Sequence, residues 1–181
     1  MTRDNDQTLQ QNRRSWRKLH IGIDADSDEI LAVEVSGREI DDAAVTDALL
    51  GQIADPIASF TADGAYDQDR VTQAIGIRHP EAAIIIPPRV GGVASASAET
   101  TPTQRDRHLR TIAERGRMAW QKASGYNLRA KVEASIGRYK RVIGDALRSR
   151  TDRTEATEVA IAAVALNRML VFERPNYIHV A

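Results

Sequence analysis

The sequence contains no cysteine, no long apolar run and no excess of either charge. Without cysteine, disulfide bonds and thiolate metal sites are excluded, and nothing points to secretion. The longest helical apolar run, Val159 to Leu166, has eight residues, whereas a helix needs about 20 to cross a bilayer. The first 16 residues are polar and contain no signal-peptide core. We therefore expect a cytoplasmic protein with no membrane partner.

The net charge of zero conceals two segments of opposite charge. Residues 1–100 carry 9 Lys and Arg against 17 Asp and Glu, whereas residues 104–150 carry 13 against 4. Positive charge concentrated in about a quarter of the chain favours a polyanionic partner. The alternative is a solvated helix surface crossed by salt bridges, and charge alone does not separate the two.

The 181 residues, 42% hydrophobic and 28% charged, are typical of one globular domain. We expect an arm or truncation remnant over residues 1–16 and a tail over residues 173–181. Between them, residues 17–172 form the domain, with a basic helical segment at 101–124.

Apolar patterns predict strands in the first half of this domain. Residues 18–24 and 29–35 flank a turn-rich cluster and predict a hairpin. Residues 58–62 and 82–86, the latter stopped by Pro87, predict two strands around a helix that Asp67 caps and that buries Val71, Ala74 and Ile75. Another helix is expected after Asp41 and Asp42, with Val45, Leu49 and Ile53 on its apolar face.

The second half predicts helices. Apolar periodicity covers residues 109–120 with a possible break at Gly116, and a long helix is expected from residue 126 to about 147. Asp152 and Glu155 have capping-box spacing at the head of a last helix that is apolar almost all round. That helix should be deeply packed. The expected order is a hairpin, then a strand–helix–strand unit, then helices. This order indicates an α/β layer architecture.

Three carboxylates stand at positions where chemistry is expected. Asp24 ends the first strand, and Asp63 follows the third strand, where Gly64 lets the backbone turn. Functional groups in α/β sheets collect at the carboxyl ends of strands. Glu133 is a lone acid inside a basic helix. Tyr126, Arg129, Glu133 and Lys140 share one stripe of that helix, beside an apolar stripe made by Val132, Ile136, Ile143 and Leu147.

The spacing Tyr126-x2-Arg129-x3-Glu133-x6-Lys140 resembles the signature around the third acidic residue of the DDE transposases of bacterial insertion sequences. The segment GYNLRAKVEASIGRYKRVIGDALRSRT, with RKLHIGIDAD around Asp24 and TADGAYD around Asp63, is similar to the insertion-sequence-five group. The resemblance runs from about Arg14 to Leu170. It implies a ribonuclease-H-like fold, with a mixed sheet flanked by helices.

The resemblance also implies metal-dependent cleavage and transfer of DNA strands. Two Mg2+ ions, with Mn2+ as a substitute, would be held by Asp24, Asp63 and Glu133, with Asp24 bridging them. One ion would activate water and later the freed 3′-hydroxyl, and the other would stabilise the leaving oxygen. Transposon ends and target DNA are the implied partners of a homo-oligomer in the nucleoid. The candidate DNA-binding residues are Tyr126, Arg129, Arg138, Lys140 and Arg141.

Several of these residues have structural alternatives. Asp26 and Asp67 lie close in sequence to Asp24 and Asp63, and we favour a turn role for Asp26 and a cap role for Asp67. Glu133 can form a surface ion pair with Arg129, one helical turn earlier. Tyr126 can simply start a helix by packing its ring on the core.

The tryptophan and histidine side chains of the domain are interpreted mainly as structural. Trp120 is expected in the core, with stacking on a flipped DNA base as the alternative. His20 is expected to be a structural hydrogen-bonding residue, and His108 has no assigned role.

The chain departs from the family pattern at its start. Complete members begin with a helical region that recognises the inverted repeats of the element, whereas here only 23 residues precede Asp24. We expect an intact metal site in a protein that is weak or inactive alone. The alternatives are a non-enzymatic DNA-binding fragment that inhibits a full transposase, and a host ribonuclease-H-like nuclease, which would keep the carboxylates but not the Tyr-Arg-Glu-Lys stripe.

Overall fold

The computed structural model describes residues 16–172, so the expected tail and nearly all of the expected arm lie outside the described residues. Strands β1 (Arg17–Ile23) and β2 (Ile30–Gly37) form the expected antiparallel hairpin. Strands β3 (Ser59–Thr61) and β4 (Ala83–Ile85) pair in parallel. The α/β class is therefore confirmed, but the described strands form two separate two-stranded sheets instead of the single mixed sheet expected.

The described residues form nine helical segments, and caps and glycine breaks set several of their ends. Asp41 caps the first one, as expected, by accepting a hydrogen bond from the Ala43 N–H. Gly116 separates two helices with a φ of 82°, a left-handed value that glycine adopts without strain. The segments are η1 (Asp42–Val45), α1 (Thr46–Leu50), η2 (Gly64–Tyr66), α2 (Asp69–Arg78), α3 (Gln104–Arg115), α4 (Arg117–Ser124), η3 (Tyr126–Arg129), α5 (Ala130–Val142) and α6 (Asp152–Phe172).

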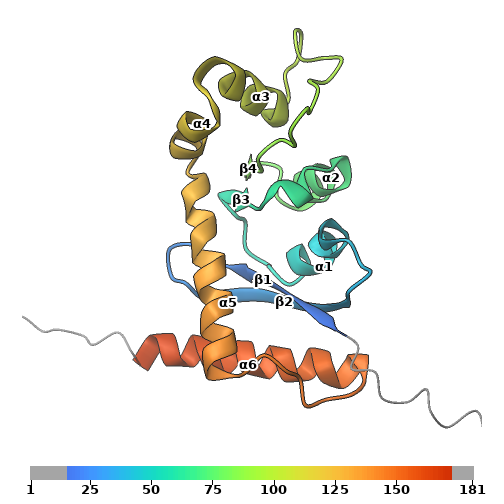
Figure 1. Ribbon diagram of the computed structural model, residues 1–181, viewed down its shortest axis with the longest axis vertical. Coiled ribbons are helices and arrows are strands. Elements are labelled where there is room, and N and C mark those ends of the chain that lie inside the picture. Colours follow the sequence, from blue (N-terminus) through green and yellow to red (C-terminus); the bar gives the residue numbers. More distant parts are fainter. Residues whose placement is uncertain (1–15, 173–181) are drawn as a thin grey trace, which may run out of the picture.

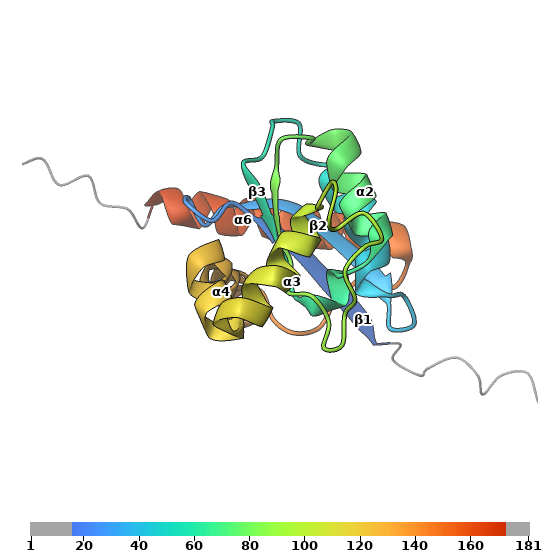
Figure 2. The ribbon, with the colours of Figure 1, turned by 90° about the horizontal axis from the view of Figure 1, so that it is seen from above.

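Helix α5 is the upright element of the fold and links its two ends (Figure 1). Helix α6 lies across the base, against the β1–β2 hairpin, and α3 and α4 lie at the opposite end. Seen from above, α3 and α4 are stacked nearest the viewer, with α6 running beneath (Figure 2). The β3–β4 pair and α2 lie between these ends, so α5 is the element that can bring distant parts of the chain together.

Three apolar clusters hold this arrangement together. One lies between the hairpin, α5 and α6 and includes Ile21, Tyr139 and Leu166. A second surrounds α2, where Val71 and Ile75 are buried as expected. The third packs α1 against the hairpin through Ala32, Val45 and Leu49. Because β2 is covered by α6 on one side and by α1 on the other, the hairpin is the central element of the core.

The expected single helix from residue 126 to about 147 is wrong at both ends. Its first turn is the 3₁₀ segment η3, and α5 ends at Val142. Gly144 follows with a φ of 122°, which leaves the helical region of backbone space. The apolar stripe therefore stops early, and Ile143 is exposed. The buried side chains of α5 are those of Ser135 and Tyr139.

The expectation that α6 is deeply packed is also wrong. Val159 and Leu166 are buried, but Ile161 and Phe172 are 65% and 84% exposed, because the hairpin and α5 cover only one face. The expected cap at the head of α6 differs too. The reciprocal bonds there join Thr151 and Thr154, while Asp152 and Glu155 pair with Arg17. No helix within residues 16–172 is long and apolar enough to span a membrane.

Candidate active site

Arg129 joins two of the three candidate carboxylates. Its Nη1 donates to Oε1 of Glu133, one helical turn later, and its Nη2 lies 3.4 Å from Oδ2 of Asp63. Glu133 stands in the first turn of α5, whereas Asp63 follows β3, 66 residues before Arg129. The guanidinium therefore bridges two acids from different parts of the fold. The ion pair between Arg129 and Glu133 is the one expected from their helical spacing.

Asp63 is held in place by the turn that follows β3. It caps η2 by accepting a hydrogen bond of 2.9 Å from the Ala65 N–H through Oδ1. The other oxygen, Oδ2, is the one that Arg129 approaches. Burial lowers the pKa of Arg129, but the hydrogen bond to Glu133 and the charges of Glu133 and Asp63 raise it overall. The guanidinium is thus a permanent positive charge between two carboxylates.

Tyr126 is positioned by an aromatic chain that begins at β4. The Ile84 carbonyl lies 2.7 Å from Nε2 of His108, and His108 Nδ1 accepts the indole N–H of Trp120 at 2.8 Å. The Trp120 ring then packs on the Tyr126 ring, with centroids 5.4 Å apart. Because Nδ1 accepts a bond, Nε2 carries the proton donated to Ile84. Residue 126, at the start of the signature, is therefore fixed to the β3–β4 sheet.

Trp120 and His20 have the structural roles expected of them. The Trp120 side chain is 1% exposed, so it belongs to the core and its ring is covered against a flipped base. His20 is buried in the hairpin, where its Nε2 lies 2.8 Å from the Ser36 hydroxyl. Burial lowers the pKa of His20, which keeps its ring neutral. His108, unassigned from the sequence, is a structural link between β4 and α4.

Asp24 is held by a different set of contacts. Its carboxylate accepts the N–H groups of Asp26 and Ser27 at 2.7 and 2.8 Å, and these bonds, Ser27 first, lower its pKa. Asp26 is an exposed turn residue, as expected. Lys131 of α5 binds this turn through the Ala25 carbonyl and, at 3.1 Å, through the Asp28 carboxylate. The end of β1 is therefore attached to the same helix that carries Glu133.

The structure brings Asp63 and Glu133 together but leaves Asp24 apart from them. Residues along an α-helix are rotated by about 100° each, so Lys131 and Glu133 leave α5 in directions about 200° apart. The Asp24 turn thus contacts one flank of α5, and the Asp63–Glu133 pair lies at the other. Within residues 16–172, no group of three or more His, Cys, Asp or Glu lies close enough to hold a metal ion.

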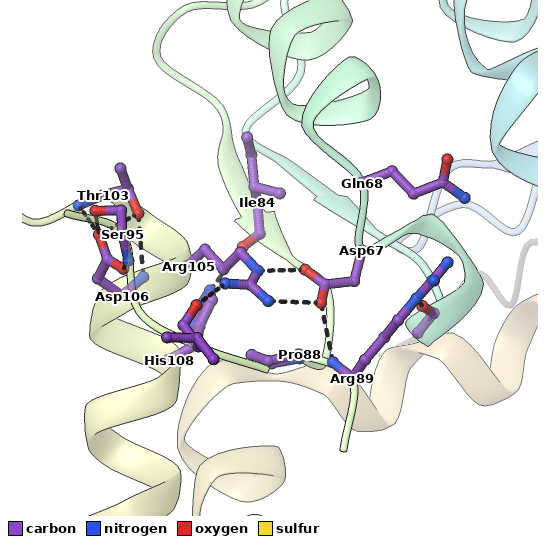
Figure 3. Close-up of polar contacts among 12 residues, drawn as sticks. Asp67, Gln68, Ile84, Pro88, Arg89, Ser95, Thr103, Arg105, Asp106 and His108 are labelled. Atoms are coloured by element: carbon purple, nitrogen blue, oxygen red, sulfur yellow. Dashed lines mark hydrogen bonds and ion pairs between the residues drawn. The ribbon is translucent and has the colours of Figure 1, made fainter. Parts of the chain in front are cut away.

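Asp67 is not the helix cap that its position suggested. The cap of α2 is Gln68, which makes no side-chain cap bond. The Asp67 carboxylate instead accepts Nε and Nη2 of Arg105 at 2.6 and 3.1 Å and the Arg89 N–H at 2.9 Å (Figure 3). Asp67 therefore ties α3 and the chain after β4 to the turn that carries Asp63.

Asp106 makes a second such attachment in the connection between β4 and α3. Its carboxylate accepts the N–H and hydroxyl groups of both Ser95 and Thr103 at 2.7–2.9 Å (Figure 3). These bonds, led by the Ser95 N–H, lower the pKa of Asp106 strongly. Residues 89–103 contain no helix or strand, yet they are fixed near both ends. The Thr103–Asp106 capping-box spacing was the available sequence signal for this contact.

The Asp67 contact predicts a stability difference that depends on pH. Burial raises the pKa of Asp67, but the Arg105 and Arg89 contacts outweigh it and lower the pKa overall. A lowered pKa contributes stability that is present above about pH 4 and is lost as the pH falls below it. We expect Asp67→Asn to lower the melting temperature at pH 7 and the gap to the unmodified protein to close in acid.

Thermal unfolding followed by circular dichroism between pH 3 and pH 7 measures this difference. Asp55→Asn, at an exposed position, is the matched control and should lower the melting temperature at neither pH. An Asp67→Asn deficit that persisted unchanged at pH 3 would contradict the ionic role of this carboxylate.

The candidate DNA-binding cations differ in exposure. Lys140 and Arg141 are exposed on α5, as are Arg107, Arg110 and Arg115 on α3. Arg138 is partly buried and donates to the Asp28 carbonyl at 3.4 Å, so its guanidinium also supports the Asp24 turn. The sequence did not reveal this use of Arg138, or that of Lys131, because both contacts span more than 100 residues.

The arrangement described so far is that of an α/β protein with acidic side chains at strand ends beside a basic helix. Residues 3–168 match the family model described as the transposase DDE domain. The chain therefore belongs to the DDE transposase family, and the resemblance expected from its sequence is confirmed at that level. A transposase domain implies DNA as its substrate, and enzymes of this family generally use divalent metal ions. No solved structure matches the chain.

Proposed function

We propose that this chain is an insertion-sequence transposase of the insertion-sequence-five group, which cleaves DNA strands and transfers them with divalent metal ions. The ions would be Mg2+, two per site, with Asp24, Asp63 and Glu133 as ligands. The fold would be ribonuclease-H-like, and the active form a homo-oligomer on transposon ends and target DNA. The family match supports the class of reaction, and the residues at the Arg129 bridge support the site.

The observation that carries this proposal is the convergence of Asp63 and Glu133 on one positive charge. Both carboxylates contact the same guanidinium, Asp63 through Oδ2 and Glu133 through Oε1, so a metal ion bound there would replace one positive charge with another. Their oxygen atoms are the ligands that Mg2+ prefers. Asp24 is assigned as the third ligand from its position at the end of β1, a strand that packs against α5. Three carboxylates are donors that suit a divalent metal ion, although Asp24 lies apart from the other two in this structure.

The protein residues contribute position and charge to the proposed reaction. When bound, the ions would activate an attacking oxygen and stabilise the leaving oxygen at phosphorus. Lys140 lies seven residues after Glu133 on the exposed side of α5, where it can hold a DNA phosphate near the carboxylates. Trp120 holds Tyr126 and thereby the start of the segment that presents Arg129 and Glu133.

The proposal is tested by two assays on the full chain with DNA. Supercoiled DNA and Mg2+ report strand nicking, and a labelled duplex that carries an element end reports transfer of its 3′ end into target DNA. We expect both reactions, and both should stop with a chelator. Nicking without transfer would identify a nuclease instead. DNA binding without nicking would identify a non-enzymatic DNA-binding protein, a reading that the exposed cations of α3 and α5 would then favour.

Binding of DNA through phosphates predicts a strong dependence on salt. Each phosphate contact contributes about 0.9 to the slope of log affinity against log salt concentration. We expect the affinity to fall as salt rises, and the double variant Lys140→Gln with Arg141→Gln to reduce the slope by about 2. Fluorescence anisotropy of a labelled duplex at several salt concentrations measures both slopes.

Arg153→Gln provides the matched control, because this cation is exposed on α6, away from the α5 stripe. Its slope should equal that of the unmodified protein. An affinity that did not change with salt would contradict the phosphate-binding role of residues 104–150.

A further inference from the structure

The guanidinium of Arg129 makes two contacts that a DNA phosphate and a metal ion would each disturb. Its side chain is about one-third exposed, and each of its two terminal nitrogens faces a different carboxylate. Removal of this cation would leave Asp63 and Glu133 as two neighbouring negative charges. These two negative charges would repel each other, so the positive charge of Arg129 offsets the electrostatic cost of placing both carboxylates beside one side chain.

Arg129 is also suited to bind phosphate. A guanidinium presents a planar set of donors that matches the oxygen atoms of a phosphate as well as those of a carboxylate. It stands on the same stripe of the signature segment as Lys140, which is exposed at the far end of that stripe. A DNA backbone that contacts Lys140 can therefore also draw Arg129 away from its two carboxylates.

We propose that Arg129 couples DNA binding to metal binding: it neutralises Asp63 and Glu133 until a DNA phosphate takes its guanidinium. This inference rests on the proposed function, because it concerns the same carboxylates and the same ligands. Metal ions and Arg129 then compete for one pair of oxygens, and DNA relieves that competition. Because such coupling is reciprocal, metal ions also strengthen DNA binding by the same factor. The arrangement restricts strand cleavage to the DNA-bound protein.

The inference predicts that loss of Arg129 strengthens metal binding in the absence of DNA. The full chain is titrated with Mn2+, and free Mn2+ is measured by electron paramagnetic resonance. Arg129→Gln should lower the Mn2+ dissociation constant at least about 5-fold, within the usual range of coupling between sites. Arg129→Lys keeps the positive charge but loses the planar set of donors that reaches both carboxylates, so its dissociation constant should lie between those of Arg129→Gln and the unmodified protein. A short duplex should strengthen Mn2+ binding to the unmodified protein at least about 5-fold, and to Arg129→Gln much less.

Arg78→Gln is the matched control for these titrations. Arg78 joins α2 to Asp47 at 3.0 Å and is 40% exposed, so this change also removes one charge from an ion pair between two elements. Its Mn2+ dissociation constant should not change. Circular dichroism tests whether each variant is folded. If Arg129→Gln does not fold, the effect of the duplex on Mn2+ binding by the unmodified protein decides the question.

The outcomes separate this inference from the proposed function. Equal or weaker Mn2+ binding by folded Arg129→Gln, or no binding by any variant, would overturn the coupling role of Arg129. Failure of the unmodified protein to cleave DNA would overturn the proposed function. It would leave the competition between Arg129 and Mn2+ intact, since the titration needs no cleavage.

Discussion

Glu133→Gln should abolish metal-dependent strand cleavage while leaving the protein folded. The amide keeps the size of the side chain but loses the charge that a metal ligand needs. Loss of residues that only support metal ligands typically costs 10–100-fold, so loss of a ligand itself should reduce the nicking rate at least about 100-fold. The Glu133 side chain is 63% exposed, and its pair with Arg129 contributes at most about 1 kcal/mol to stability. The melting temperature should therefore change little.

The nicking rate of supercoiled DNA in Mg2+ and the melting temperature are measured on the same preparations. Glu81→Gln, an exposed residue between α2 and β4, is the control for loss of one negative charge and should nick DNA normally. Retention of cleavage by Glu133→Gln would remove this residue from the proposed site. A large drop in melting temperature would show that its contact with Arg129 is structural.

Local patterns in the sequence predicted local features of the site. The spacing of Arg129 and Glu133 predicted their ion pair because residues four apart meet on any helix. The break at Gly116 followed from the conformational freedom of glycine. The positions of Asp24 and Asp63 followed from the ends of two apolar runs. Each of these predictions needed only residues that are close together in the chain.

Contacts between distant residues could not be predicted in this way. Asp67 has the sequence of a helix cap, but Arg105, 38 residues later, supplies stronger charged hydrogen bonds to its carboxylate. The contact of Arg129 with Asp63 spans 66 residues and depends on how η3 packs beside β3. The composition of α6 likewise shows that it is apolar, but the face it buries is decided by the hairpin, which covers only part of its circumference.

Among the substitutions proposed here, Trp120→Ala should lower the stability of the protein most. The indole is almost fully buried, donates to His108 and packs on Tyr126, so its loss creates a cavity and leaves the partly buried His108 Nδ1 without this donor. Such truncations cost about 3–5 kcal/mol, which lowers the melting temperature of a domain this size by roughly 6–20 °C.

The second tryptophan of the chain supplies the control for this prediction. Trp16 is 79% exposed, so Trp16→Ala should change stability by less than about 0.5 kcal/mol. Trp120→Phe keeps most of the packing and loses the bond to His108, so its melting temperature should lie between those of Trp120→Ala and the unmodified protein. Thermal unfolding followed by far-ultraviolet circular dichroism measures all three variants. Equal stability of Trp120→Ala and Trp16→Ala would show that the aromatic chain from Ile84 to Tyr126 does not hold the signature segment against β4.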